Sequence, residues 1–218
     1  MKKLLLLLAA VTLLTACNLE DIPTRVPEPT ALAASPDDSR TLYAIAPAES
    51  SVAFAVGETL KGKRITAVGA TPQVSGGLLL DMDDLATALV GPIDIDATSF
   101  HTDDPNRDRS INKWLLLSRA YPLIRFTPTA VNNLPPSAAI GDTITFEIVG
   151  DLLITTYSEP VTFAVTAAVV EEGRIEGTAV GTLQRDDYKL TIPAVPGVAD
   201  VDQEVTLTFD FVALAVSP

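Results

Sequence analysis

The strongest constraint on the fold is a period of two in hydrophobicity that recurs along the chain from residue 41 onward. Five runs alternate apolar side chains with small or polar ones, at residues 52–56, 93–96, 144–154, 161–166 and 205–211. Each run is typical of a strand with one buried face. Weaker strand candidates lie at residues 42–46, 73–80, 124–131 and 174–183. Because antiparallel sheets alternate in this way and parallel ones are apolar throughout, the sequence predicts an antiparallel all-β fold.

Eight or nine strands with one apolar face must close into a barrel or pack as a sandwich. Residues 41–218 are long enough for one such domain with a sizeable core. One segment departs from the strand period, because apolar residues Ile111, Trp114 and Leu115 fall at helical spacing. Asp103 and Asp104 are placed to favour a helix start. We therefore expect one short helix, over residues 105–117, between strands.

The N-terminus resembles a bacterial lipoprotein signal. Lys2 and Lys3 precede an apolar stretch over residues 4–14, which has signal-peptide length and is too short to span a bilayer. Small residues then lead to Cys17, the only cysteine in the chain. We expect a signal peptide over residues 1–16, lipidation of Cys17 and a proline-rich acidic tether over residues 17–40. The alternative is an ordinary signal peptide with a chance cysteine.

Charge narrows the class of partners. The chain has a net charge of −13, or −15 without Lys2 and Lys3 (13 basic against 28 acidic side chains). Such an acidic chain should not bind nucleic acid or an anionic bilayer by electrostatics, so membrane contact is expected through the acyl chains on Cys17. With a single cysteine, no internal disulfide can form.

The residue types needed for catalysis are scarce, so we expect no catalytic residue, no metal site and no cofactor. His101 is the only histidine and lies in a polar segment. Neighbouring carboxylates occur as pairs at predicted strand ends, where solvated acids are expected. Asp81, Asp83 and Asp84 could ligate calcium, but their spacing lacks the Gly and terminal Glu of a calcium loop. An enzyme that uses a carboxylate pair remains the weakest alternative.

The barrel interior is the remaining candidate site. About eight strands can enclose either side chains alone or one small apolar ligand. Periodicity identifies which residues face inward, but it does not show whether a hole remains between them. A core filled by its own side chains is therefore the simpler interpretation of the pattern alone.

A series of short motifs runs through nearly the whole domain, beginning at Tyr43-Ala44-Ile45. Its further elements are residues 51–56, residues 74–81, residues 93–100 with Thr102, the Arg107-Asp108 pair, residues 121–126, residues 150–154 and residues 160–163. In this order, the motifs resemble the YceI-like family of polyisoprenoid-binding proteins. The chain lacks the glycine that many members have in two turns, where it has Thr155-Thr156 and Lys189. Ser110 replaces a histidine that is frequent in the family's helix.

The resemblance implies an eight-stranded antiparallel lipocalin-like barrel with a helix near its mouth. It also implies an elongated apolar pore for an isoprenoid or similar amphiphilic chain, and it brings no catalytic residues. The inward-facing positions expected to line the pore are Phe54, Leu78, Leu80, Ile95, Trp114, Phe126, Phe146, Ile148, Phe163, Val165, Tyr188, Leu207 and Phe209. On charge alone, Arg107 and Arg185 are candidates for a lipid head group; the simpler alternative is an ion pair with Asp108 or Asp187.

The leading hypothesis is a non-enzymatic carrier or storage protein for a polyisoprenoid or other long-chain amphiphilic lipid. It would be lipid-anchored on the outer side of the cytoplasmic membrane, or in an outer membrane if the organism has one. The alternative is a structural module with a side-chain-filled barrel that contacts another envelope protein. The sequence leaves a homodimer open.

Overall fold

Strands dominate the computed structural model, which describes residue 32 and residues 38–216. The expected signal peptide, Cys17 and most of the expected tether lie outside these described residues. Among the described residues, no helix has both the length and the apolar character needed to cross a bilayer.

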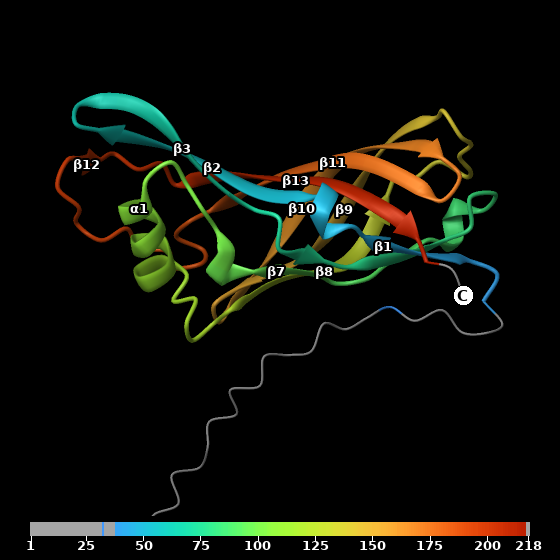
Figure 1. Ribbon diagram of the computed structural model, residues 1–218, viewed down its shortest axis with the longest axis horizontal. Coiled ribbons are helices and arrows are strands. Elements are labelled where there is room, and N and C mark those ends of the chain that lie inside the picture. Colours follow the sequence, from blue (N-terminus) through green and yellow to red (C-terminus); the bar gives the residue numbers. More distant parts are fainter. Residues whose placement is uncertain (1–31, 33–37, 217–218) are drawn as a thin grey trace, which may run out of the picture.

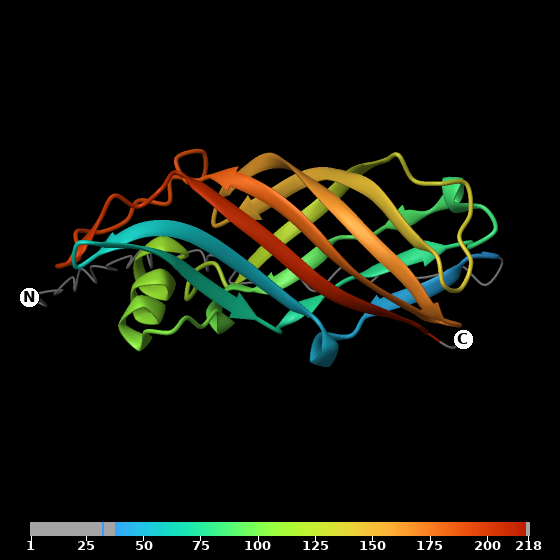
Figure 2. The same ribbon diagram turned by 90° about the horizontal axis from the view of Figure 1, so that it is seen from above.

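The strands form one antiparallel sheet that curls around a common interior (Figures 1 and 2); we call this curled sheet the barrel. The seven long strands are β2 (Ser51–Leu60), β3 (Lys63–Thr71), β8 (Leu123–Asn132), β9 (Thr143–Ile154), β10 (Tyr157–Glu171), β11 (Arg174–Gln184) and β13 (Glu204–Ala215). The short strands are β1 (Thr41–Ile45), β4 (Val74–Ser75), β5 (Gly77–Leu80), β6 (Leu89–Val90), β7 (Ile93–Asp96) and β12 (Val198–Ala199).

The all-β antiparallel prediction is confirmed, but the expected count of eight strands is not. The described sheet has thirteen strands because short segments at its sides pair separately. The run predicted at residues 73–80 is divided at Gly76, so that β4 pairs with β7 while β5 pairs with β1. A Cβ atom on Gly76 would lie 2.4 Å from the Ile93 Cδ1 atom and 3.1 Å from the Pro92 carbonyl oxygen, so a larger residue at this division would displace the Ile93 side chain.

The predicted helix forms, but it changes from an α-helix to a π-helix halfway along. Helix α1 covers Pro105–Ser110 and continues as a π-helical turn, η4 (Ile111–Leu115). The Asp104 carboxylate caps α1 by accepting a 2.7 Å hydrogen bond from the Asn106 N–H. Three single 3₁₀ turns complete the helical elements: η1 (Pro47–Glu49), η2 (Leu85–Thr87) and η3 (Ala97–Ser99).

The two ends of the barrel are built differently (Figures 1 and 2). One end carries α1, the tip of the β2–β3 hairpin and the loop that contains β12; we call it the helix end. The other carries η2 and the loop over residues 133–142, and we call it the loop end. The hairpin tip is Lys61-Gly62, with φ of 49° and 78°, as tight hairpin turns with two positive φ values require.

One turn of the barrel is strained. Ile154 pairs with Tyr157 across the two-residue loop Thr155-Thr156, and Thr155 has φ of 56°. A β-branched residue is an outlier in this left-handed region. This is one of the two turns in which the sequence lacks the glycine common in similar proteins; Lys189, in the other, has φ of 54°.

We predict that Thr155→Gly stabilises the domain. Relief of left-handed strain, about 1–2 kcal/mol, should exceed the added chain entropy of glycine, so the free energy of unfolding should rise by about 0.5–1 kcal/mol. Urea unfolding measures the change. Thr156→Gly is the matched control: Thr156 has no positive φ, so this change should lower stability. Equal effects of both substitutions would contradict the strain argument.

Candidate functional site

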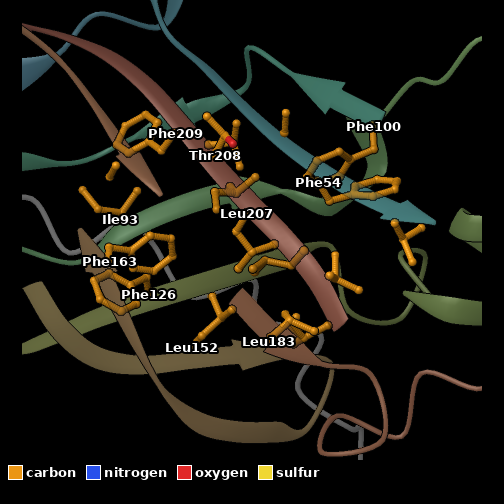
Figure 3. A pocket seen from close by; sticks show the side chains of 18 of the residues that line it. Phe54, Ile93, Phe100, Phe126, Leu152, Phe163, Leu183, Leu207, Thr208 and Phe209 are labelled. Atoms are coloured by element: carbon orange, nitrogen blue, oxygen red, sulfur yellow. The ribbon is translucent and has the colours of Figure 1, made fainter. Parts of the chain in front are cut away.

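The inward faces of the strands surround an apolar cavity of about 630 Å³. This volume falls within the roughly 300–1,000 Å³ typical of small-molecule sites. Figure 3 shows side chains from several strands pointing into the same space, among them Phe126, Leu152, Phe163, Leu207 and Phe209. The strand period therefore places apolar groups around a hollow interior, which leaves the cavity wall with few polar groups.

Aromatic pairs form part of the wall. The rings of Phe126 and Phe163 meet edge to face, with centroids 5.0 Å apart. Those of Phe54 and Phe100 are tilted, at 5.7 Å. Such pairs add about 0.5–1.5 kcal/mol beyond the burial of their area, so they stabilise the wall.

Partial exposure of inward-facing residues identifies the space as a true hollow. On β9, Leu152 and Ile154 are buried, whereas Phe146 and Ile148 on the same face are only half-buried. Leu207 and Phe209 on β13 are also half-buried. Packed interiors leave almost no voids larger than a water molecule. These side chains therefore border unfilled volume, and the interpretation of a side-chain-filled barrel is wrong.

Eleven of the thirteen residues expected to line the pore do border the cavity. They are Phe54, Leu78, Leu80, Ile95, Phe126, Phe146, Ile148, Phe163, Val165, Leu207 and Phe209. Whether each contacts a ligand stays a prediction.

Trp114 and Tyr188 do not line the cavity, contrary to expectation. The helix turns Ile111 and Leu115 toward the cavity, and Trp114 remains 56% exposed. Tyr188 is buried within the barrel wall, where its hydroxyl donates a 3.2 Å hydrogen bond to the backbone oxygen of Glu159. Burial raises the pKa of Tyr188 well above its ordinary value, and nearby carboxylates, that of Glu159 first, raise it further.

Two segments outside the strand period also line the cavity. The helix contributes Ile111 and Leu115, and the loop after β11 contributes Ile192, Pro193 and Val195. A usable signal was present in the sequence, because residues 190–201 are unusually apolar for a loop. Strand periodicity alone could not place this loop over one end of the barrel.

Arg107 borders the cavity at the helix end with its charge already compensated. Its guanidinium donates to the Glu58 carboxylate at 2.8 Å and also pairs with Asp103. Burial alone would lower the pKa of Arg107, but these two carboxylates outweigh that effect and raise the pKa above its ordinary value. The Asp108 partner that the sequence suggested is wrong: the Asp108 carboxylate instead accepts hydrogen bonds from the backbone and hydroxyl of Thr102.

Arg185 also borders the cavity, and its guanidinium is hydrogen-bonded to backbone carbonyl oxygens. It donates to the carbonyl oxygens of Asp202 at 2.7 Å, Leu190 at 2.8 Å and Val201 at 3.2 Å. These bonds tie together the two ends of the loop over residues 190–201, so Arg185 holds that loop in place. Asp187 is not its partner. Both arginines border the cavity, as expected of head-group candidates, but neither pairs with the aspartate that the sequence suggested.

Two loops cover the cavity at the loop end. Leu85 of η2 is buried and lines the cavity there. Its N–H donates to the Pro136 carbonyl oxygen at 2.8 Å, and the Ala138 N–H donates to that of Met82 at 3.0 Å. These bonds join the two loops across this end of the barrel.

Metal-binding geometry is absent from the part of the chain that the structure describes: no three His, Cys, Asp or Glu side chains gather there as metal ligands would. The side chain of His101 is 78% exposed, and its Nδ1 lies 3.4 Å from the Asp108 carboxylate.

Comparison with known proteins gives one family and several similar folds. Residues 43–213 match the family model described as the YceI-like domain. No curated protein matches the chain. A polyisoprenoid binding domain from Saccharophagus degradans, implicated in plant cell wall breakdown, has a TM-score of 0.64 at 15% identity, covering 80% of this chain and 98% of that one.

Two other solved structures share the fold at low identity. BcnA from Burkholderia cenocepacia has a TM-score of 0.60 at 22% identity, covering 77% of this chain and 98% of that one. The YCEI protein of Campylobacter jejuni has a TM-score of 0.52 at 17% identity, covering 66% of this chain and 82% of that one. At these identities the likeness shows a common fold.

The hollow interior predicts an unusual stability pattern along β9. Phe146→Ala removes a side chain that already borders empty space, so it should lower the free energy of unfolding by only about 1–2 kcal/mol. Leu152→Ala, on the same face and fully buried, should lower it by about 2–5 kcal/mol although it removes fewer atoms. Urea denaturation of both variants tests this order. A larger loss for Phe146→Ala would mean that the interior is packed.

Proposed function

This chain belongs to the YceI-like family, and on that premise we propose that it binds a polyisoprenoid or another long-chain amphiphilic lipid in its cavity. The observation that carries the proposal is the hollow, almost wholly apolar interior beside the Arg107–Glu58 pair. The family's fold is a binding fold, and the proposal includes no catalytic step.

The physical basis is transfer of apolar surface from water. Each methylene-sized group of a ligand that enters a dry apolar site contributes about 0.8 kcal/mol. A branched or unsaturated hydrocarbon chain of several units could therefore bind firmly with few polar contacts. The polyisoprenoid binding domain from Saccharophagus degradans, which has a similar fold, supports an isoprenoid as the first candidate.

The polar groups beside the cavity lie at the helix end. Arg107 is paired with carboxylates, and Arg185 is occupied by three carbonyl oxygens. Neither arginine could bind a phosphate without breaking partly buried bonds. Lys61 also lines the cavity and makes no ion pair among the described residues, so it is the cation that could meet a charged head group. A hydroxyl head group could instead bind at the edge of the Arg107–Glu58 pair.

We also propose that the protein acts at the cell envelope through a lipid on Cys17. The support is the sequence alone: a charged start, an apolar stretch of signal-peptide length and small residues before Cys17. The anchor would keep the cavity close to a bilayer that supplies or receives its ligand.

Lipid extraction tests the binding proposal. Mass spectrometry of solvent extracts from the purified full chain should find a co-purified isoprenoid or another long-chain amphiphilic lipid. Ile148→Trp should fill the cavity and remove most of that lipid. Val149→Trp, on the outer face of the same strand and outside the lining, is the matched control and should keep it. Wild-type protein without bound lipid from several hosts would refute the proposal.

The anchor is tested separately. Cys17→Ser should move the protein from the membrane fraction to the soluble envelope fraction, because the acyl chains provide its attachment. The domain should keep its fold, measured by near-ultraviolet circular dichroism and bound lipid. A Cys17→Ser protein that stays in the membrane fraction would count against lipidation at this residue.

A further inference from the structure

Charge is distributed unevenly over the domain. Three segments make up the helix end, residues 58–64, 101–121 and 185–204, and together they carry nine basic and nine acidic side chains. The remaining described residues carry three basic and fifteen acidic ones. The helix end is therefore neutral on balance, whereas the rest of the described domain is strongly negative. An anionic bilayer surface repels the barrel wall and the loop end, but it does not repel the helix end.

The same end exposes large apolar side chains next to a basic one. Trp114 is 56% exposed and Leu117, at the end of the same helix, is 43% exposed. The Lys113 ammonium lies 4.6 Å from the centre of the Trp114 ring. Tryptophan is enriched at membrane–water interfaces, where lysine extends its charge toward the head groups.

Leu117 occupies the left-handed position of the helix cap, where the following Ser118 N–H donates to the Asn112 carbonyl oxygen at 2.9 Å. Leu117 has φ of 48°, a left-handed conformation that glycine or asparagine usually supplies at helix ends. A leucine there costs of order 1–3 kcal/mol, and this one leaves much of its side chain in water. Strain at an exposed apolar residue points to a role for that residue outside the core.

The loop that contains β12 covers the cavity at this end. The loop over residues 190–201 lines the cavity and carries Val195, which is 38% exposed. It is joined to the hairpin by pairing of β12 with β2, and Arg64 donates to the Asp200 carbonyl oxygen at 2.7 Å. Among the described residues no hydrogen bond joins the loop to α1, so a ligand would enter between the apolar loop and the helix.

From these observations we propose that the helix end docks on the surface of a lipid bilayer, with Trp114 and Leu117 inserted at the level of the head groups. Docking in this orientation presents the loop-covered end of the cavity to the membrane, so that a lipid can pass between bilayer and cavity without crossing water.

The expected anchor does not impose this orientation by itself. Strand β1, which begins at Thr41, lies at the far side of the barrel from α1 (Figure 1). A stretch of 24 residues, from 17 to 40, can extend to roughly 75 Å. The barrel is about 50 Å long, judged from the 15 residues of β10 at about 3.3 Å each. An anchored domain could therefore present either end to the bilayer, and a docking surface selects one.

The single tryptophan makes the test direct. Trp114 is the only tryptophan in the chain, so intrinsic fluorescence reports on this surface alone. The full chain is reconstituted on phosphatidylcholine vesicles with a minority of phosphatidylglycerol. We expect the emission of Trp114 to shift to shorter wavelength, and brominated acyl chains to quench it at least twofold.

A relocated tryptophan provides the matched control. The double variant Trp114→Phe with Ile140→Trp carries its only tryptophan on the loop end, where Ile140 is 64% exposed. Both proteins attach to the vesicles through the same N-terminal segment. A difference in quenching between them therefore reports which end of the barrel faces the bilayer. Quenching that is equal in the two proteins, whether strong or absent, overturns the proposal. A concentration-dependent shift of Trp114 without vesicles would assign the surface to a second copy of the chain, which also overturns it.

A charge at position 117 tests the apolar contact. Leu117→Asp should reduce quenching of Trp114 at least twofold, and the uncharged Leu117→Asn should reduce it less. Both residues accept a left-handed backbone, so the fold should persist. Quenching unchanged in Leu117→Asp overturns the proposal. The readout needs no bound ligand, so it can succeed or fail independently of lipid co-purification.

Discussion

A curled sheet with one apolar face must keep that face out of water, by enclosing either its own side chains or a ligand. The rest of the structure depends on this requirement. The long strands direct their apolar side chains inward, yet those side chains do not meet at the centre. Phe146, Phe163 and Leu207 remain half-buried around the space that they border. An apolar wall around unfilled volume is less stable than a packed core, because its atoms lack contacts on one side. A bound hydrocarbon chain would supply those contacts, and this is the physical link between the fold and the proposed function.

The two ends of the barrel are closed by different sets of hydrogen bonds. At the loop end, Leu85 and Ala138 belong to loops that bond to one another and cover the interior. At the helix end, the Arg185 guanidinium donates to the carbonyl oxygens of Leu190 and Val201 within the loop over residues 190–201 and of Asp202 just after it. The first closure is made by bonds between two loops, and the second by Arg185 and by pairing of β12 with β2. Among the described residues no hydrogen bond joins the second loop to α1, so the gap between them is the better candidate for ligand entry.

Charge is balanced at the helix end, both inside and outside the cavity. Beside the cavity, Arg107 pairs with Glu58, whereas Lys61 lines the cavity without an ion pair among the described residues. Over the outer surface, balanced basic and acidic residues produce a neutral end on a negative domain. The polar groups that a lipid head group could meet therefore lie at the end of the domain that an anionic bilayer does not repel.

Local pattern in the sequence was enough to predict the strands, the helix start and the inward-facing residues. Period two specifies which side chains share a face, so Phe54, Phe126 and Phe163 could be placed correctly without coordinates. The same reasoning failed at Trp114, because a π-helical turn shifts which residues face the barrel, and at Tyr188, which is buried in the wall. The hollow itself, the partners of Arg107 and Arg185, and the loop that covers one end depend on contacts between segments far apart in the chain. Only the tertiary structure decides these, because the volume left between facing side chains depends on how far the sheet curls, which no local period encodes.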